Sequence, residues 1–215
     1  MSTRRGQNDG RLESGNDTAR LFIGIQPDSA TQHFLDGLCS HARGLLPPGR
    51  GRTRWTSASN RHLTLAFLGE TPASLIPKIE SSLVQLAHIA RPCSARIVSL
   101  GPFPRPRASL LAAELISNPD LDRLHNGCRD LMRELGMKPE SAAFRPHFTL
   151  ARNRRGFGRF PAEQLDFIAQ LNHLALYRSD MAPGGSQYTP LFEVLLDDQD
   201  PADGEGAPPG TDRQA

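Results

Sequence analysis

Two pentapeptides of the sequence carry the same pattern of side chains. They are His62-Leu63-Thr64-Leu65-Ala66 and His147-Phe148-Thr149-Leu150-Ala151, and each reads His, apolar, Thr, Leu, Ala. In an extended strand, side chains two positions apart point to the same face. The histidine and threonine of each copy therefore share one face. The apolar positions share the other face, which in the first copy continues to Phe67.

These residue types suit the hydrolysis of a phosphodiester. Imidazole titrates near pH 6.5, so one histidine can be neutral and remove a proton while the other is protonated and donates one. A threonine hydroxyl can donate a hydrogen bond to a non-bridging phosphate oxygen, where negative charge builds up. The repeat predicts two related lobes whose polar faces meet in one cleft.

Arginine is concentrated around both copies. Arg outnumbers Lys 23 to 2, and residues 43–61 and 145–159 contain no acidic residue but ten arginines: Arg43, Arg50, Arg52, Arg54, Arg61, Arg145, Arg152, Arg154, Arg155 and Arg159. Arginine suits bidentate contact with phosphate, so these runs favour an anionic ligand. Trp55 and Phe157 lie within the runs, where each is either a platform for a nucleic-acid base or a core aromatic. We therefore take Arg54 and Trp55 as candidate cleft residues.

Two other interpretations of the histidines are weaker. Isolated structural histidines in strands would not explain a shared pentapeptide. A metal site would need a third ligand at suitable spacing, and we find none. Cys39, Cys93 and Cys128 are odd in number, widely spaced and form no CxxC pair, which predicts reduced thiols and a cytoplasmic protein.

Composition limits the organisation of the 215-residue chain. Residues 1–19 and 197–215 contain almost no large apolar side chains, so we expect disordered tails around one domain over residues 20–196, the second tail being acidic. No run of apolar residues is long enough to span a membrane or to act as a secretory signal. Glycine-loop nucleotide motifs are also missing from the sequence.

Periodicity and turn residues predict an α+β fold with mostly antiparallel sheets. Strands are expected over residues 20–26, 62–69, 94–100, 109–116, 146–151, 171–179 and 188–196, with a short extended piece at 53–56. Helices are expected from Asp28 or Ser29 to about 45, from Thr71-Pro72 to about 90 and from Asn118 or Asp120 to Gly136, with a short helix at 162–169.

With these residues identified, the sequence resembles the two-histidine (2H) phosphoesterases. Within them it is most similar to the RNA 2′,3′-cyclic phosphodiesterases, formerly called 2′–5′ RNA ligases. The resemblance covers about residues 20–196 and is carried by Arg20-LFIGI, Asn60-RHLTLAFLGE, Pro146-HFTLAR and the closing Tyr188-TPL after Gly184-Gly185.

The resemblance implies a bilobal fold, with two antiparallel sheets and flanking helices around a central cleft on a pseudo-two-fold axis. It implies hydrolysis of an RNA 2′,3′-cyclic phosphate to a 2′-phosphomonoester, with no metal or other cofactor. Carried over by motif position, His147 is the proton acceptor and His62 the proton donor. Thr64, Thr149 and Arg152 then bind phosphate, and Phe67 lines the cleft.

We expect the partner to be RNA with 2′,3′-cyclic phosphate ends, with tRNA fragments as one candidate source. We expect no membrane partner and a monomeric protein. Two alternatives stay open: a phosphodiesterase acting on a small cyclic phosphate, such as a nucleotide or an ADP-ribose derivative, and a non-catalytic RNA-binding module. The reverse reaction, 2′–5′ joining of RNA ends, is expected to be slow because water is the abundant nucleophile.

Overall fold

The computed structural model describes residues 3–5, 17–46, 53–158, 160–183 and 185–196. Within them the strands are β1 (Thr3–Arg5), β2 (Thr18–Gln26), β3 (Arg54–Trp55), β4 (Leu63–Pro72), β5 (Ser94–Phe103), β6 (Leu110–Leu115), β7 (His147–Arg152), β8 (Glu163–Gln170), β9 (His173–Ala182) and β10 (Gly185–Leu195). The α-helices are α1 (Ser29–Leu45), α2 (Ile76–Ile89) and α3 (Pro119–Glu134), with short 3-10 turns η1 (Ala58–Asn60) and η2 (Ala73–Leu75).

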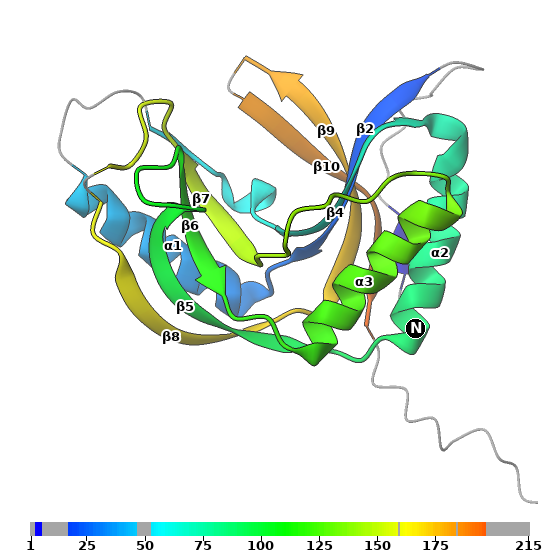
Figure 1. The fold of residues 1–215 in the computed structure, drawn as a ribbon, viewed down its shortest axis with the longest axis horizontal. Coiled ribbons are helices and arrows are strands. Elements are labelled where there is room, and N and C mark those ends of the chain that lie inside the picture. Colours follow the sequence, from blue (N-terminus) through cyan, green and yellow to red (C-terminus); the bar gives the residue numbers. More distant parts are fainter. Residues whose placement is uncertain (1–2, 6–16, 47–52, 159, 184, 197–215) are drawn as a thin grey trace, which may run out of the picture.

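The sheet consists of two halves that meet at one point (Figure 1). One half has the order β1-β10-β9-β2-β4 and the other the order β7-β6-β5-β8, with β3 also paired to β7. Strands β4 and β7 pair only through Leu63 and Phe148, which are antiparallel partners. Leu63 and Phe148 occupy the same position in the two pentapeptides, so this pair relates the copies by a local two-fold axis. The predicted bilobal α+β fold is confirmed, and the two sheets are continuous at this pair.

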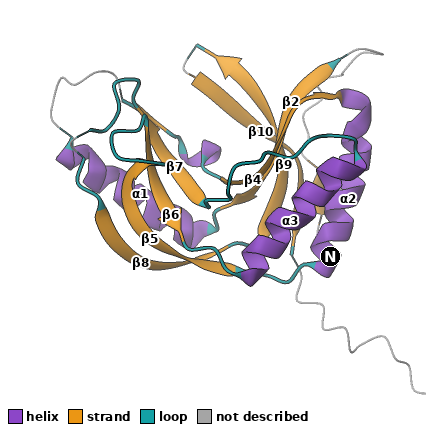
Figure 2. Ribbon diagram, in the orientation of Figure 1, coloured by secondary structure: helices purple, strands orange, loops and turns teal. Residues whose placement is uncertain are grey.

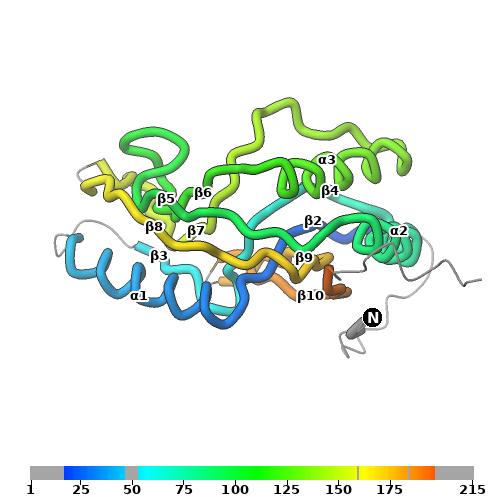
Figure 3. The backbone as a smooth tube through the Cα atoms, turned by 90° about the horizontal axis from the view of Figure 1, so that it is seen from below, coloured from blue at the N-terminus to red at the C-terminus, as the bar shows by residue number. Residues whose placement is uncertain are grey.

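Each half of the sheet is covered by a helix that follows a strand of the other half (Figures 2 and 3). Helix α1 follows β2 but packs against β8, where Phe34 stacks on Phe167 at a ring-centroid distance of 4.0 Å. Helix α3 follows β6 but lies against β4, where His125 Nδ1 is 2.9 Å from the Leu65 carbonyl oxygen. This exchange ties the halves together, and their buried apolar side chains form one large core cluster.

Helices α1 and α3 begin at the residues that the sequence indicates, whereas α2 begins at Ile76 and the predicted start, Thr71-Pro72, is the end of β4. The Asp28 carboxylate accepts a hydrogen bond from the Thr31 amide at 2.9 Å and caps α1. Asn118 accepts bonds from the amides of Asp120 and Leu121 at 3.1 and 3.0 Å and caps α3. Each cap satisfies amides that the first turn of a helix leaves without a partner.

The predicted short helix at 162–169 is wrong, because this segment is strand β8. It pairs antiparallel with β5, with Ala95 opposite Ala169. Leu165 and Phe167 pack against the core, while the alternate residues Gln164, Asp166 and Ile168 are exposed. This is the period of two of a strand with one buried face. The apolar positions of these eight residues do not by themselves distinguish a strand from a short helix.

The predicted boundary at residue 20 is two residues late. Strand β2 begins at Thr18, and Thr3–Arg5 pairs with β10 as an edge strand, which the prediction of a disordered first tail did not include. The rest of residues 1–16 and all of 197–215 lie outside the described residues.

Three further properties concern the described part of the chain. Cys39, Cys93 and Cys128 are free thiols buried in the core. None of the helices in these ranges is long and apolar enough to cross a membrane. No three His, Cys, Asp or Glu side chains in the same ranges gather as a metal-binding set.

Candidate active site

The two pentapeptides meet where the halves of the sheet join. Leu63 and Phe148 are opposite each other and fully buried. In an antiparallel pair the flanking residues also face each other, so His62 lies beside Thr149 and Thr64 beside His147. All four side chains are on the face opposite the buried pair. The histidines are close enough for the charge of His147 to lower the pKa of His62.

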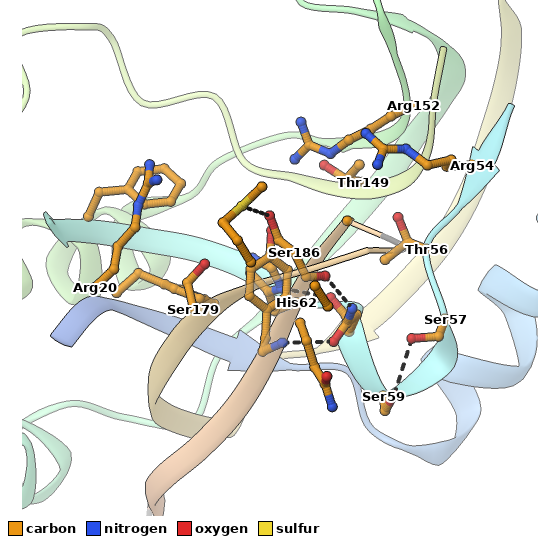
Figure 4. Close-up of a pocket in the computed structure, with 18 of the residues that line it drawn as sticks. Arg20, Arg54, Thr56, Ser57, Ser59, His62, Thr149, Arg152, Ser179 and Ser186 are labelled. Atoms are coloured by element: carbon orange, nitrogen blue, oxygen red, sulfur yellow. Dashed lines mark hydrogen bonds between the residues drawn. The ribbon is translucent and has the colours of Figure 1, made fainter. Parts of the chain in front are cut away.

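A cavity of about 1120 Å³ opens beside this junction (Figure 4). Of the residues predicted from the sequence, its wall includes His62, Thr149, Arg152, Phe67, Arg54 and Trp55. Thr64 and His147 are at the junction but are not part of the wall. Instead, the His147 ring stacks on Phe103, with the ring centroids 4.0 Å apart.

Both imidazoles are held in the same way. His62 Nδ1 is 2.9 Å from the carbonyl oxygen of Asn60, and His147 Nδ1 is 2.8 Å from that of Arg145. A carbonyl oxygen only accepts hydrogen bonds, so Nδ1 carries the hydrogen in each ring. The neutral form of each histidine therefore presents an unprotonated Nε2, the atom that can exchange a proton with a ligand.

The His62 ring rests on an aromatic cluster that is separate from the main core. Its centroid is 4.6 Å from the ring of Phe22 and 4.9 Å from that of Tyr188, and Phe22 stacks on Tyr177 at 4.8 Å. Burial lowers the pKa of His62 to about 4, and the charges of His147 and Arg152 act in the same direction. His62 is therefore neutral at pH 7.

His147 is supported by a different set of side chains. The guanidinium of Arg145 lies 4.5 Å above the Phe103 ring on which His147 stacks, and it is bonded to Glu114 Oε1 at 2.6 Å. Burial lowers the pKa of His147, while the Glu114 carboxylate opposes the shift. Each histidine is thus neutral and backbone-oriented before any ligand binds.

The cavity wall is rich in arginine. Arg54 and Arg152 are direct partners across the β3–β7 pair, and like charges in that position destabilise a sheet. In the described part of the chain, no carboxylate is bonded to Arg152, Arg154 or Arg20, which all line the cavity. An anionic ligand would neutralise this charge.

Comparison with known proteins agrees with this geometry. The profile of the 2′-5′ RNA ligase superfamily matches residues 27–180. The chain belongs to this superfamily. It is 33% identical to the RNA 2′,3′-cyclic phosphodiesterase of Thermus thermophilus over 141 residues, which are 63% of this chain and 71% of that protein.

It is also 33% identical to the Bacillus subtilis protein of the same name over 110 residues, 51% of this chain, and so matches about 60% of that relative's length. The crystal structure of Escherichia coli LigT complexed with 3′-AMP superposes with a TM-score of 0.65 at 28% identity, covering 84% of this chain and 99% of LigT.

In this superfamily member, two residues that precede His62 are anchors that the sequence patterns missed. The Asn60 side chain donates to the Ser186 carbonyl at 3.0 Å and accepts from the Tyr188 amide at 3.1 Å, which ties η1 to β10. Arg61, 5% exposed, pairs with Asp36 of α1 at 2.7 Å. The segment that leads into His62 is thus anchored to both β10 and α1, and no local sequence signal marks Asn60 for this role.

Two of the ten arginines in the acid-free runs have carboxylate partners from outside those runs. Arg61 pairs with Asp36 and Arg145 with Glu114, so neither charge is free for a ligand. Arg50, Arg52 and Arg159 lie outside the described residues. Phe157 is 2% exposed and belongs to the core, so it is not a platform for a base.

Trp55 forms part of the cavity wall and also packs against the core. The guanidinium of Arg43 covers its ring at 4.6 Å from the centroid. Both interpretations of this tryptophan are therefore compatible with its position at the rim.

Phe67 shows how a β-bulge changes the face of a residue. Strict alternation from His62 places Phe67 on the core face, yet it is 48% exposed and lines the cavity. The β2–β4 register shifts between Ile23 and Gly24, so that Leu65 has no partner. One extra residue reverses the alternation, and Phe67 joins the face of His62 as the resemblance implied.

Proposed function

We propose that the protein hydrolyses the 2′,3′-cyclic phosphate at the end of an RNA chain and leaves a 2′-phosphomonoester. The observation that carries this proposal is the meeting of two imidazoles, each with Nδ1 bonded to a carbonyl, beside a cavity lined by arginine. The names of the relatives support the substrate class. The 3′-AMP bound to LigT supports a nucleotide at the chain end.

In the proposed reaction, His147 Nε2 removes a proton from water as the water oxygen bonds to phosphorus. The bond between phosphorus and the ribose 3′-oxygen breaks, and protonated His62 donates its Nε2 proton to that oxygen. The products are a 2′-phosphomonoester and a 3′-hydroxyl. His147 then holds the proton that His62 has lost, and exchange with solvent restores the starting state. Each proton transfer typically contributes about 10²–10⁴-fold in rate.

Three further side chains stabilise the phosphate in this scheme. Thr149 beside His62 and Thr64 beside His147 donate hydrogen bonds to the two non-bridging oxygens. Arg152 is on the same strand as Thr149 and supplies positive charge at the cavity wall. These donors are most useful as charge builds up on the five-coordinate phosphorus.

The size of the cavity is compatible with a nucleotide at the end of an RNA chain. Pockets for small molecules typically enclose roughly 300–1,000 Å³. The cavity of about 1120 Å³ is slightly larger than this range.

Product analysis tests the proposal. An oligoribonucleotide ending in a 2′,3′-cyclic phosphate should give a 2′-phosphate, in excess EDTA as well as without it. His62→Asn and His147→Asn should each lower kcat by about 10²–10⁴-fold, with an unchanged circular dichroism spectrum. A 3′-phosphate product would contradict the assignment of donor and acceptor. Binding of this RNA without any turnover would favour the RNA-binding module instead.

A further inference from the structure

One face of β2 runs from the histidine junction to the far end of the cavity. Its alternate residues on this face are Gly24, Phe22 and Arg20, whereas Ile23 and Leu21 belong to the main core cluster. A Cβ atom on Gly24 would lie 3.6 Å from His62 Cδ2, so Gly24 marks the position of the reacting group. Arg20 lies four residues away, about 13 Å along the strand.

Figure 4 shows the resulting separation of the arginines. Thr149, Arg152 and Arg54 lie together on one side of His62, and Arg20 and Ser179 lie on the other side. Between them the Phe22 ring is 4.6 Å from His62 and 6.0 Å from the exposed Phe67. A ligand that extends from Arg152 to Arg20 therefore passes over His62 and then over the rings of Phe22 and Phe67.

In the described part of the chain, no hydrogen bond or ion pair holds the Arg20 side chain. The residue opposite it in the β2–β4 register is Glu70, which would be a natural ion-pair partner. However, Glu70 accepts a hydrogen bond from the Thr18 hydroxyl at 3.4 Å, and no carboxylate is bonded to Arg20. The Arg20 side chain is exposed on the cavity wall, so its guanidinium is available to a ligand.

We propose that Arg20 forms a second phosphate site, which binds the phosphate on the 5′-oxygen of the terminal ribose. In an RNA chain this is the phosphodiester that precedes the reacting end. The inference rests on the proposed function, in which the cyclic phosphate lies between the histidines beside Arg152. The ribose then spans the two sites over the Phe22 and Phe67 side of the cavity. Ser179, on the same side as Arg20, presents a hydroxyl as a second donor.

The test compares adenosine 2′,3′-cyclic phosphate with the same nucleotide carrying a 5′-phosphate and with the dinucleotide ApA ending in a 2′,3′-cyclic phosphate. For each, kcat/KM is measured with the wild-type protein, Arg20→Gln and the matched control Arg91→Gln. Arg91 is an exposed arginine that follows α2 outside the cavity wall.

In Arg20→Gln, the preference for either 5′-phosphorylated substrate over the unphosphorylated one should fall about tenfold, the effect of losing one charge-assisted hydrogen bond. Arg91→Gln should keep the wild-type preference. Replacing the phosphodiester of the dinucleotide with a neutral methylphosphonate should lower kcat/KM of the wild type by the same factor. The same replacement should lower kcat/KM of Arg20→Gln little further. If kcat/KM is higher for the dinucleotide than for the 5′-phosphorylated mononucleotide, the site binds the phosphodiester of RNA. Equal kcat/KM values would mean that it binds any 5′-phosphate.

An unchanged preference in Arg20→Gln would overturn the second site, as would an equal loss on all three substrates. These results would leave the proposed function intact. Failure of the wild-type protein to hydrolyse any of the substrates would instead contradict the proposed function.

Discussion

An anion in the cavity should raise the pKa of His62 by about 2–3 units. Burial lowers this pKa from 6.5 to about 4. The shift corresponds to about 3 kcal/mol against the charged form, and at pH 7 about one molecule in a thousand is protonated. Such a group cannot serve as a proton donor until something stabilises its charge.

The substrate phosphate can supply this stabilisation. Two unit charges about 4 Å apart interact by about 4 kcal/mol at an effective dielectric constant of about 20. That energy is comparable to the penalty that burial imposes on His62, so one bound phosphate is enough to return the pKa to the neutral range. The proton donor would thus be created by the ligand on which it acts.

The assay is an NMR titration of histidine-labelled protein, with and without saturating inorganic phosphate, and with His62→Asn to assign the signal. His125 provides an internal control, because burial also lowers its pKa but its ring stacks on Phe144 outside the cavity wall. His62 should shift and His125 should not. A His62 pKa that stays near 4 with the site saturated would refute its role as proton donor.

Three other outcomes follow from the same site. Because folding lowers the pKa of His62, the unfolded chain binds more protons between pH 6.5 and about 4, so stability falls as pH falls through this window. In urea denaturation, the free energy of unfolding should fall less with pH in His62→Asn than in the wild type, by up to about 3 kcal/mol at pH 4. An equal pH dependence in the two proteins would contradict the lowered pKa of His62. Since the pKa values of both His62 and His147 are lowered, kcat/KM should peak below pH 6.5, and a maximum above pH 7 would be inconsistent. Gly24→Ala places a Cβ 2.9 Å from the Leu63 carbonyl and should destabilise the fold by about 1–3 kcal/mol and lower kcat; wild-type values in thermal melts and rate assays would show that the backbone adapts.

The chemistry of the site could be predicted from the sequence because each signal is local. The repeat of His and Thr two positions apart specifies a shared face in any strand, and the caps Asp28 and Asn118 act within three residues of themselves. The bilobal α+β fold followed from the same patterns. For the shared strand face and the helix caps, every interacting group lies within one turn or one strand.

Other features depend on contacts between distant segments and are not encoded locally. Arg61 lies in an acid-free run of the sequence, yet Asp36 of α1 neutralises it in the fold. The bulge at Leu65 turned Phe67 into the cavity, because one extra residue reverses the alternation of a strand. Segment 163–170 is a strand because it pairs with the edge of β5 that β6 does not occupy.

The sequence by itself determined which side chains can move protons and bind phosphate, since residue type and strand alternation are properties of the chain. Tertiary structure alone decided that Leu63 pairs with Phe148 and that Arg20 faces the histidine site from the far end of the same cavity. The physical reason is that backbone pairing between β4 and β7 is chosen by the packing of the whole core. Burial in that packing, and no local pattern, also sets the protonation state of His62.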